Sequence, residues 1–305
     1  MHVFLTVDVE CYTGDYESEV YGKGFGLPYI LDVLRKYDVK ATFFVEALGA
    51  TRWGGKQVAR ICSDVINAGH EVQLHVHPVI AKINGFEDTT DVLRNQDRAT
   101  QAMLIGRGIE ILKECGVTVS AFRAGDFAAN HDTLAAMREC GLVISSNRDL
   151  DRKCSTRSML NEIFPVRNDI SEWAGIVDVP LTVLKSPVPF LDGYYRHFEV
   201  SALGAWEMRY AIASMVKAEY SCVTVLTHPR EFFTKRKDVF WPDRKNRKRF
   251  EALLRFLSRK KDLWLSQVGA CARINMPQVS PREVRGSTAA ALVRIFQQVV
   301  SRRRG

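Results

Sequence analysis

Short apolar segments alternate with segments of helical spacing along about the first 270 residues of this 305-residue chain. Their length and apolar character predict strands at residues 3–7, 40–45, 70–78, 117–122, 141–145, 176–183, 222–226 and 263–268. The recurrence of apolar positions predicts helices at residues 27–37, 57–68, 95–114, 131–139, 202–217 and 247–257. Strands that are apolar on both faces and alternate with helices favour a parallel (β/α) barrel of seven or eight strands.

The composition fits one large domain. With 305 residues, 46% of them hydrophobic, the chain can bury a sizeable core. Its seven cysteines are odd in number and form no CxxC pair, so neither a disulfide framework nor a thiolate zinc site is predicted. No apolar run reaches the roughly 18 residues that span a bilayer, and the first residues lack the features of an export signal. We therefore expect a cytoplasmic protein.

The formal net charge of +8 is unevenly placed. Basic runs lie at residues 235–237, 244–249, 259–261 and 302–304, whereas residues 8–20 are acidic. A basic surface favours an anionic partner. A membrane surface or an anionic glycan fits better than nucleic acid, because the sequence has no nucleic-acid-binding motif. The alternative is a solvated basic face that binds nothing.

Polar residues gather where the predicted strands end, and in a parallel barrel the chemistry lies at these ends. They are Asp8, Glu10, His75, His77, Arg123, Asp126, residues 147–151, Thr227 and His228. Each of them alone has an ordinary explanation, since an acidic residue after a strand often caps a helix and a His-Pro pair often forms a turn. Their shared position makes them candidates for one site.

The most specific pair is His75 and His77, because residues two apart on a strand face the same way. Two imidazoles supply only nitrogen ligands, and a hydrolytic zinc centre usually adds a third protein ligand, often a carboxylate. The pair therefore indicates a metal site that needs an acidic partner from another strand. The alternative is that both histidines line a strand end and hydrogen-bond to their neighbours.

Five motifs, taken in chain order, resemble those of the polysaccharide deacetylases. They are Thr6-Val7-Asp8-Val9-Glu10, Lys40-Ala41-Thr42-Phe43-Phe44-Val45, Gly69-His70-Glu71-Val72-Gln73-Leu74-His75, Phe122-Arg123-Ala124-Gly125 and Leu226-Thr227-His228-Pro229. The resemblance covers about residues 1–270 and implies a distorted (β/α) barrel of seven or eight strands, in agreement with the alternation above. We expect this barrel to occupy residues 1–276.

The resemblance also implies roles for individual residues. Asp8 corresponds to the catalytic base, His228 to the general acid, and Arg123 to the residue that orients the base. A divalent metal ion, expected to be zinc, would be bound by Glu10 with His75 and His77. Asp149 and Asp151 could orient Arg123 or His228, or serve as caps.

The sequence departs from the common family pattern at three places. Val9 separates Asp8 from Glu10, as in a subgroup that writes its acidic pair as Asp-x-Glu. The metal-binding histidines of the family are usually more widely spaced than His75 and His77. The family motif Arg-x-Pro reads Arg123-Ala124-Gly125 here, so a backbone amide near Asp126 or Phe127 would stabilise the oxyanion.

The function that these residues imply is hydrolysis of an amide. The expected protein is a metal-dependent hydrolase that removes the N-acetyl group from an N-acetylated sugar in a glycan or glycolipid precursor. Asp8 would accept a proton from water and His228 would protonate the leaving amine. Two alternatives remain: a non-catalytic barrel that binds sugar or metal, and a hydrolase of another amide.

The C-terminal segment, residues 277–305, lies outside the resemblance. After a turn-rich linker at residues 277–286, an apolar stripe of helical spacing is formed by Leu292, Ile295, Phe296, Val299 and Val300. Arg294 is expected on the flank of this stripe and residues 302–304 at its end. The stripe could pack against the outer helices of the barrel or a partner subunit. Alternatively, it could adsorb to an anionic membrane as a peripheral contact.

Overall fold

The structure is a computed structural model that describes residues 1–305 except 84, 150–157, 165–167, 189–194, 274–283 and 303–305. The strands are β1 (His2–Val9), β2 (Thr42–Glu46), β3 (Glu71–Val76), β4 (Ala121–Ala124), β5 (Ile144–Ser145), β6 (Ser171–Trp173), β7 (Ile176–Asp178), β8 (Val183–Lys185), β9 (Tyr195–His197), β10 (Cys222–Thr227), β11 (Phe233–Arg236), β12 (Val239–Pro242), β13 (Trp264–Ser266) and β14 (Val284–Arg285). The helices are α1 (Leu27–Tyr37), α2 (Gly49–Trp53), α3 (Lys56–Asn67), α4 (Arg98–Glu114), α5 (His131–Glu139), α7 (Ala205–Lys217), α8 (Arg244–Leu257) and α9 (Thr288–Arg302).

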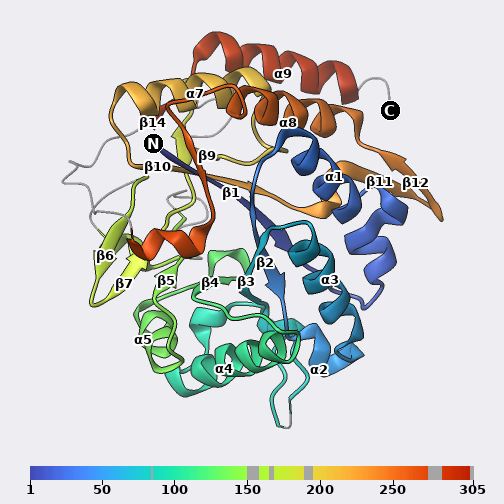
Figure 1. Ribbon diagram of the computed structural model, residues 1–305, viewed down its shortest axis with the longest axis vertical. Helices are drawn as coiled ribbons and strands as arrows, with labels where there is room; N and C mark the ends of the chain where they lie inside the picture. The colour runs from blue at the N-terminus through green and yellow to red at the C-terminus, as the bar shows by residue number, and fades with distance from the viewer. Residues whose placement is uncertain (84, 150–157, 165–167, 189–194, 274–283, 303–305) are drawn as a thin grey trace.

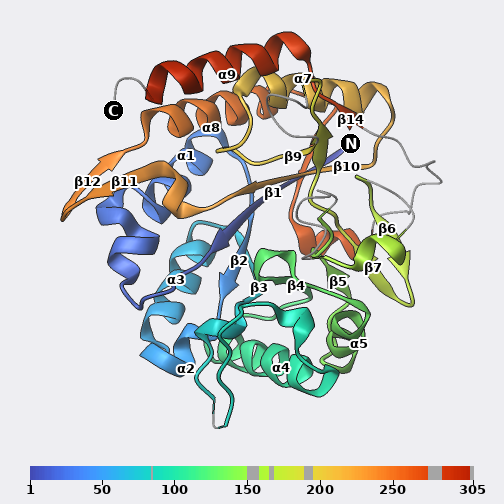
Figure 2. The same ribbon diagram turned by 180° about the vertical axis from the view of Figure 1, so that it is seen from behind.

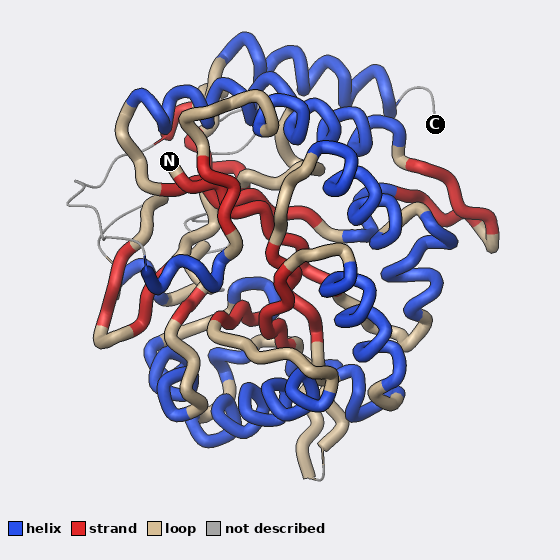
Figure 3. Tube along the Cα trace, in the orientation of Figure 1, coloured by secondary structure: helices blue, strands red, loops and turns tan. Residues whose placement is uncertain are grey.

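The fold is mixed α/β with a curled, mostly parallel sheet. Seven strands pair in parallel in the order β10-β1-β2-β3-β4-β5-β7, and β6 adds an antiparallel edge to β7. An eighth parallel strand, β13, pairs with the first residues of β1. Figure 3 shows the central strands of this sheet with helices around them, whereas the hairpin of β11 and β12 projects at the edge of the molecule. The prediction of a distorted parallel (β/α) barrel of seven or eight strands is confirmed.

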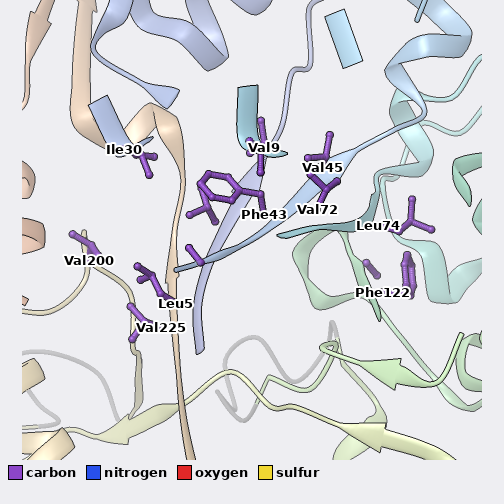
Figure 4. Packing of buried hydrophobic residues seen from close by; sticks show 14 of the residues in the cluster. Leu5, Val9, Ile30, Phe43, Val45, Val72, Leu74, Phe122, Val200 and Val225 are labelled. Carbon is purple, nitrogen blue, oxygen red and sulfur yellow. The ribbon is translucent and has the colours of Figure 1, made fainter. Parts of the chain in front are cut away.

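The two faces of the sheet have different contents. On β1 to β4 the apolar residues that point outward, among them Leu5, Phe43, Leu74 and Phe122, join the main hydrophobic core beneath the helices (Figure 4). The alternate positions point into the barrel. A smaller core that includes Phe4, Phe44, Ala121, Val177 and Cys222 fills the lower part of the interior. The inward positions nearer the carboxyl ends of the strands are polar. The site therefore lies at the carboxyl end of the barrel, next to this smaller apolar core.

The curled sheet is completed by a short segment without regular structure. After β7, Leu181 N donates to the Arg148 carbonyl at 3.0 Å, and Thr182 N donates to the Thr224 carbonyl of β10 at 3.4 Å. Thr224 N donates in return to the Thr182 hydroxyl at 2.9 Å. These bonds hold the segment that follows β7 against β10, the strand that directly precedes His228.

Side-chain caps fix where several helices begin. Asn130 and Thr133 form a reciprocal capping box at the start of α5, and Asp97 and Asp243 accept backbone N–H groups at the starts of α4 and α8. α4 and α5 lie at one end of the molecule and α7, α8 and α9 at the other, as Figures 1 and 2 show from opposite sides. The helices therefore cover the outside of the barrel and leave the carboxyl ends of its strands accessible.

The bounds of several predicted elements differ from those observed. α1 and α5 match the predicted ranges, but the segment predicted as one strand at 176–183 is β7 followed by a separate β8, which pairs with β9 and β14. Residues 11–26, between the first predicted strand and the first predicted helix, contain short helical turns at Glu17–Tyr21 and Gly22–Gly24. The proposed linker lies largely outside the described residues, so the domain division at residue 276 stays a prediction.

The C-terminal helix α9 is oriented differently from the prediction that its apolar stripe packs against the outer helices. Phe296 is 69% exposed and Leu292 is 47% exposed, whereas Arg294 is 1% exposed. Arg294 Nε donates to Glu207 Oε2 of α7 at 2.7 Å. A buried carboxylate without a cation would cost more free energy than an exposed leucine, so the helix turns Arg294 toward Glu207. The prediction that Leu292 and Phe296 pack against the outer helices, with Arg294 on the flank, was therefore wrong.

None of the helices in the described part of the chain combines the length and apolar composition that a bilayer-spanning segment requires.

His70, just before β3, generates a prediction about stability. Its ring lies 5.5 Å from the Phe43 ring, and neither ring nitrogen has a hydrogen-bond partner among the described residues. Burial, with a smaller effect from Lys40, lowers the pKa of His70 to about 4. Between pH 6.5 and 4 the unfolded chain then binds a proton that the folded chain does not, so the free energy of unfolding decreases as the pH falls through this window.

We expect His70→Leu, which keeps a side chain of similar volume, to remove this dependence. Between pH 7 and pH 5 the variant should lose roughly 2 kcal/mol less stability than the wild type, a value that follows from the size of the pKa shift. Urea unfolding at the two pH values measures the difference. An equal loss in both proteins would mean that His70 is protonated in the folded state.

Candidate metal centre and active site

Glu10, His75 and His77 meet at the carboxyl end of the barrel. Glu10 Oε1 lies 3.1 Å from His75 Nε2 and 3.2 Å from His77 Nε2. The three ligand atoms all lie within 4.8 Å of one another, and all three side chains are buried. The first strand and the third strand therefore deliver one carboxylate and two imidazoles to a single point, as the sequence predicted for a metal site.

Hydrogen bonds on the far side of each ring hold the two imidazoles in place. His75 Nδ1 lies 2.8 Å from the Arg123 carbonyl, which can only accept, so Nδ1–H donates. In the neutral ring the lone pair of Nε2 then faces Glu10. His77 Nδ1 lies 2.6 Å from Asp91 Oδ2. Such partners are typical of histidines that ligate a metal, because they fix the tautomer and the orientation of the ring.

Asp8 and Arg123 form an ion pair beside this group. Arg123 Nη1 donates to Asp8 Oδ1 at 2.6 Å and to the Thr6 hydroxyl at 3.1 Å. Its other nitrogens donate to the carbonyl and the hydroxyl of Ser146. Arg123 is fully buried and its guanidinium lies 4.1 Å from the Phe44 ring. Arg123 thus holds the Asp8 carboxylate in position.

His228 lies beside Asp8 and Glu10, directly after β10, and ligand atoms of these three residues lie within 4.8 Å of one another. Its Nε2 is 3.9 Å from Glu10 Oε1, and its Nδ1 is 2.8 Å from Glu231 Oε1. Glu199 lies on the same side, with Oε1 3.8 Å from His228 Nδ1. The second carboxylate oxygen of Glu231 accepts from the Thr227 hydroxyl at 2.8 Å. The ring of His228 is therefore held by carboxylates behind it, and its Nε2 faces the site.

Opposite charges shift the pKa values in this group despite burial. Burial raises the pKa of Glu10, but hydrogen bonds with His75 and His77 hold it well below its usual value. Burial lowers the pKa of His77 and of His228. Asp91 and Glu10 nevertheless raise the pKa of His77 to about 10, and Glu231 and Glu10 raise that of His228 to about 9. The negative charge of Glu10 and the positive charges of the histidines His77 and His228 therefore stabilise one another.

Residues 3–145, which extend from the second residue of β1 to the end of β5 and contain five of the residues described above, match the family model for polysaccharide deacetylase. This segment, slightly less than half of the chain, is similar to the polysaccharide deacetylases. The matched segment carries Asp8, Glu10, both histidines and Arg123, whereas His228 lies beyond it. The roles of these residues stay predictions.

Solved structures with a similar fold include other proteins described as deacetylases. One from Mycobacterium smegmatis, described as a polysaccharide deacetylase, is 16% identical over 92% of this chain and 94% of its own, with a TM-score of 0.59. One from Pseudomonas aeruginosa PAO1, described as a probable polysaccharide deacetylase, is 13% identical over 89% of each chain, with a TM-score of 0.55. An allantoinase is 14% identical over 89% of each chain, with a TM-score of 0.57. At these identities the likeness shows the fold alone. A comparison with curated proteins gave no match.

Several side chains at the site were not found from the sequence, including Glu199 and Glu231 beside His228 and three others around Glu10 and His77. Arg230 donates to Glu10 Oε2, the Tyr12 hydroxyl lies 3.0 Å from His77 Nε2, and Asp91 holds His77 from behind. Tyr12 continues the alternation of Asp8 and Glu10, and Arg230 directly follows the Thr-His-Pro motif. The sequence around each of these two residues could therefore have indicated its place at the site. Asp91 lies in a loop without any pattern and had none.

Other candidates have different surroundings from those predicted. Asp149 Oδ1 lies 3.0 Å from His197 Nε2, and Arg123 is oriented by Thr6 and Ser146. Asp151 lies outside the described residues. Asp126 and Phe127 both have positive φ values, 52° and 57°, in the turn that follows β4. This turn follows Arg123 directly and is where the oxyanion donor is expected.

The chemistry of the donor set fits a divalent metal ion. Two imidazole nitrogens and one carboxylate oxygen form the ligand set of many hydrolytic zinc centres. The carboxylate is ionised and each histidine has a partner on its Nδ1, so Glu10, His75 and His77 could hold such an ion through atoms that already converge.

Gly125 gives a test of this geometry. A Cβ atom at Gly125 would overlap the His77 ring, because the turn after β4 packs directly against it. We expect Gly125→Ala to displace His77 and weaken zinc affinity at least tenfold, the size of effect seen when the orientation of a ligand is lost. Competition with a chromophoric chelator measures the affinity.

Gly106→Ala is the matched control. A Cβ there would lie 3.9 Å from Cys140 Sγ, an ordinary contact on α4 far from the site in sequence. This variant should bind zinc like the wild type. Unchanged affinity in Gly125→Ala would mean that His77 is not a ligand.

Proposed function

We propose that this protein is a zinc-dependent hydrolase that removes the N-acetyl group from an N-acetylated sugar in a glycan or glycolipid precursor. The observation that carries the proposal is the buried group of Glu10, His75 and His77 with Asp8 and His228 beside it, since ligand atoms of Asp8, Glu10 and His228 lie within 4.8 Å of one another. Amide hydrolysis needs a base and an acid within reach of one electrophilic centre, and these five residues offer both.

The ion held by Glu10, His75 and His77 would polarise the amide carbonyl and lower the pKa of water. Asp8 accepts the proton of the attacking water. Its carboxylate is ready for this role, because Arg123 holds one oxygen at 2.6 Å. As the carbonyl carbon becomes tetrahedral, negative charge develops on its oxygen, and a backbone N–H near Asp126 or Phe127 is the expected donor to it.

His228 then donates a proton to the nitrogen of the leaving amine, which is too basic to leave as an anion. Glu231 holds the ring through Nδ1, so Nε2 is the atom that transfers the proton. The C–N bond breaks, and the products are acetate and the free amino sugar. Asp8 then releases its proton to solvent and His228 takes one up, which restores both groups for another turnover.

A second candidate is hydrolysis of a different amide. The similar fold of the allantoinase supports it, since a protein with this architecture acts on a substrate other than a sugar. The close spacing of His75 and His77 leaves room for a third reading, a barrel that binds sugar or metal without turnover. Release of acetate separates these readings.

Purified protein should contain about one zinc ion per chain and release acetate from N-acetylglucosamine oligomers. A chelator should abolish the release and added zinc should restore it. Asp8→Asn should lower kcat by about 1000-fold or more, because it removes the base, while zinc stays bound to Glu10, His75 and His77. Metal analysis and acetate assays on the same samples provide both measurements.

Asp149→Asn is a control carboxylate outside the proposed machinery and should retain activity. Metal binding without acetate release from any N-acetylated sugar would favour the non-catalytic barrel or another amide. Full activity in Asp8→Asn would assign the role of base to a different residue.

We also propose that α9 contacts an anionic membrane, so that the site acts near a lipid-linked glycan; the cytoplasmic location remains part of this proposal. The exposed side chains of Leu292, Val293 and Phe296 support it, because they are available to enter the interface. Leu292→Ser with Phe296→Ser should lower binding to phosphatidylglycerol vesicles about tenfold or more without unfolding α9, since the pair of Arg294 and Glu207 is kept. Vesicle co-sedimentation measures this. Equal binding by both proteins would rule out the contact.

A further inference from the structure

A cavity of about 820 Å³ lies between α9 and the first turns of α7 and α8, away from the proposed catalytic residues. Its lining includes Trp206 of α7, Val293 and Arg294 of α9, and a group of cations on α8. Figures 1 and 2 show these three helices side by side at one end of the molecule. The composition of this lining is unusual, because it combines positive charge with apolar surface.

The positive charge is concentrated on α8. Arg244, Lys245 and Lys248 are exposed along the cavity, and Arg249 lines it as well. These residues lie in the first two turns of the helix. A solvated basic surface alone would not indicate a ligand, since exposed lysines are normally satisfied by water.

Arg249 is the most buried of the cations that α8 contributes to the cavity. It is 5% exposed, and its Nη1 donates to the Ser201 carbonyl at 2.8 Å. Its Nη2 has no hydrogen-bond partner among the described residues. Burial lowers the pKa of Arg249, and the charge of Arg294 lowers it further. A buried guanidinium with a free N–H group beside a second guanidinium lacks its counter-ion.

The carboxylates near the cavity are already engaged. Glu207 accepts from Arg294 Nε at 2.7 Å and from Gly204 N at 2.8 Å. Asp243 caps α8 by accepting from Asn246 N at 2.8 Å. The positive charge of the cavity therefore exceeds the negative charge provided by the chain, which favours an external anion.

The opposite wall of the cavity is apolar. Trp206 is 63% exposed, and Val293 and Ala290 line the side formed by α9. This wall continues outside the cavity into Phe296, which is 69% exposed. A purely inorganic anion would leave this wall in contact with water, whereas a ligand with an apolar part would cover it.

We propose that the cavity binds the phosphate group of an amphiphilic ligand. The phosphate contacts Arg249 and the lysines of α8, and the apolar part lies against Trp206 and Val293. A membrane phospholipid is the source that the continuous apolar surface of α9 favours. The cavity stands independently of the proposed hydrolase activity, and it rests on the proposed membrane contact only for the origin of its ligand.

The test uses the full chain and two kinds of probe. Dihexanoyl phosphatidate, below its micelle concentration, is a soluble phosphate with an apolar part, and glycerol phosphate is the same head without it. Vesicles of phosphatidylcholine with and without phosphatidylglycerol present the phosphate in a membrane. Calorimetry and co-sedimentation measure the respective affinities.

Lys245→Glu with Lys248→Glu is the principal variant, because both side chains are exposed and the change leaves the core intact. It should weaken binding of dihexanoyl phosphatidate and of phosphatidylglycerol vesicles at least tenfold. Arg259→Glu with Lys260→Glu makes the same change of charge just after α8 and should bind like the wild type. Trp206→Ala should weaken binding of dihexanoyl phosphatidate but leave that of glycerol phosphate unchanged.

The outcomes separate this proposal from the membrane contact of α9. Leu292→Ser with Phe296→Ser should bind vesicles more weakly but bind dihexanoyl phosphatidate like the wild type. Both changed residues are exposed on α9 and do not line the cavity. Equal affinity of the principal variant and the wild type for dihexanoyl phosphatidate would overturn the site. So would the absence of binding by the wild type. Equal affinity for glycerol phosphate and dihexanoyl phosphatidate would overturn the apolar half of the proposal.

Discussion

The interior of the barrel holds ionised groups away from water, and the ion pair of Arg123 with Asp8 is the interaction on which this depends. Burying an unpaired carboxylate or an unpaired guanidinium costs much free energy, so Asp8, which is 2% exposed, and Arg123, which is fully buried, stabilise each other. Arg123 also places its carbonyl against His75, so one residue holds both the base and a ligand. The side chains of the site are thereby connected through the backbone of β4.

The alternation of the strands provides the geometry for this arrangement. On β1 the residues Leu5, Val7 and Val9 secure the strand to the helices, and the intervening Thr6 and Asp8 face the interior. The same pattern leaves His75 and His77 on the inner face of β3. Because each strand is fixed from outside by its apolar residues, its register also fixes which polar atoms meet inside.

This pattern explains how far the sequence predicted the site. Asp8, Glu10, His75 and His77 could be found because their period of two places them on one face, and parallel strands bring their ends together. Asp91 could not, since a loop position becomes adjacent to His77 only through tertiary structure. The same limit applied to the fold: α1 and α5 carry clear boundary signals, whereas β8 and the turn after β4 depend on contacts with distant segments. In the C-terminal segment, the periodicity of apolar residues identified the helix but not the face that packs against the protein. That face is set by the ion pair of Arg294 with Glu207, which the periodicity of apolar residues does not reveal.

The pair of Glu207 and Arg294 has a consequence for motion. A helix that packs through apolar side chains can roll about its axis by small steps, exchanging one contact for another of similar energy. α9 cannot do so, since any rotation would separate two charges in a medium of low dielectric constant. Its rotational freedom is removed by a single directional bond, and the surface that it presents to the surroundings has a fixed orientation relative to the barrel.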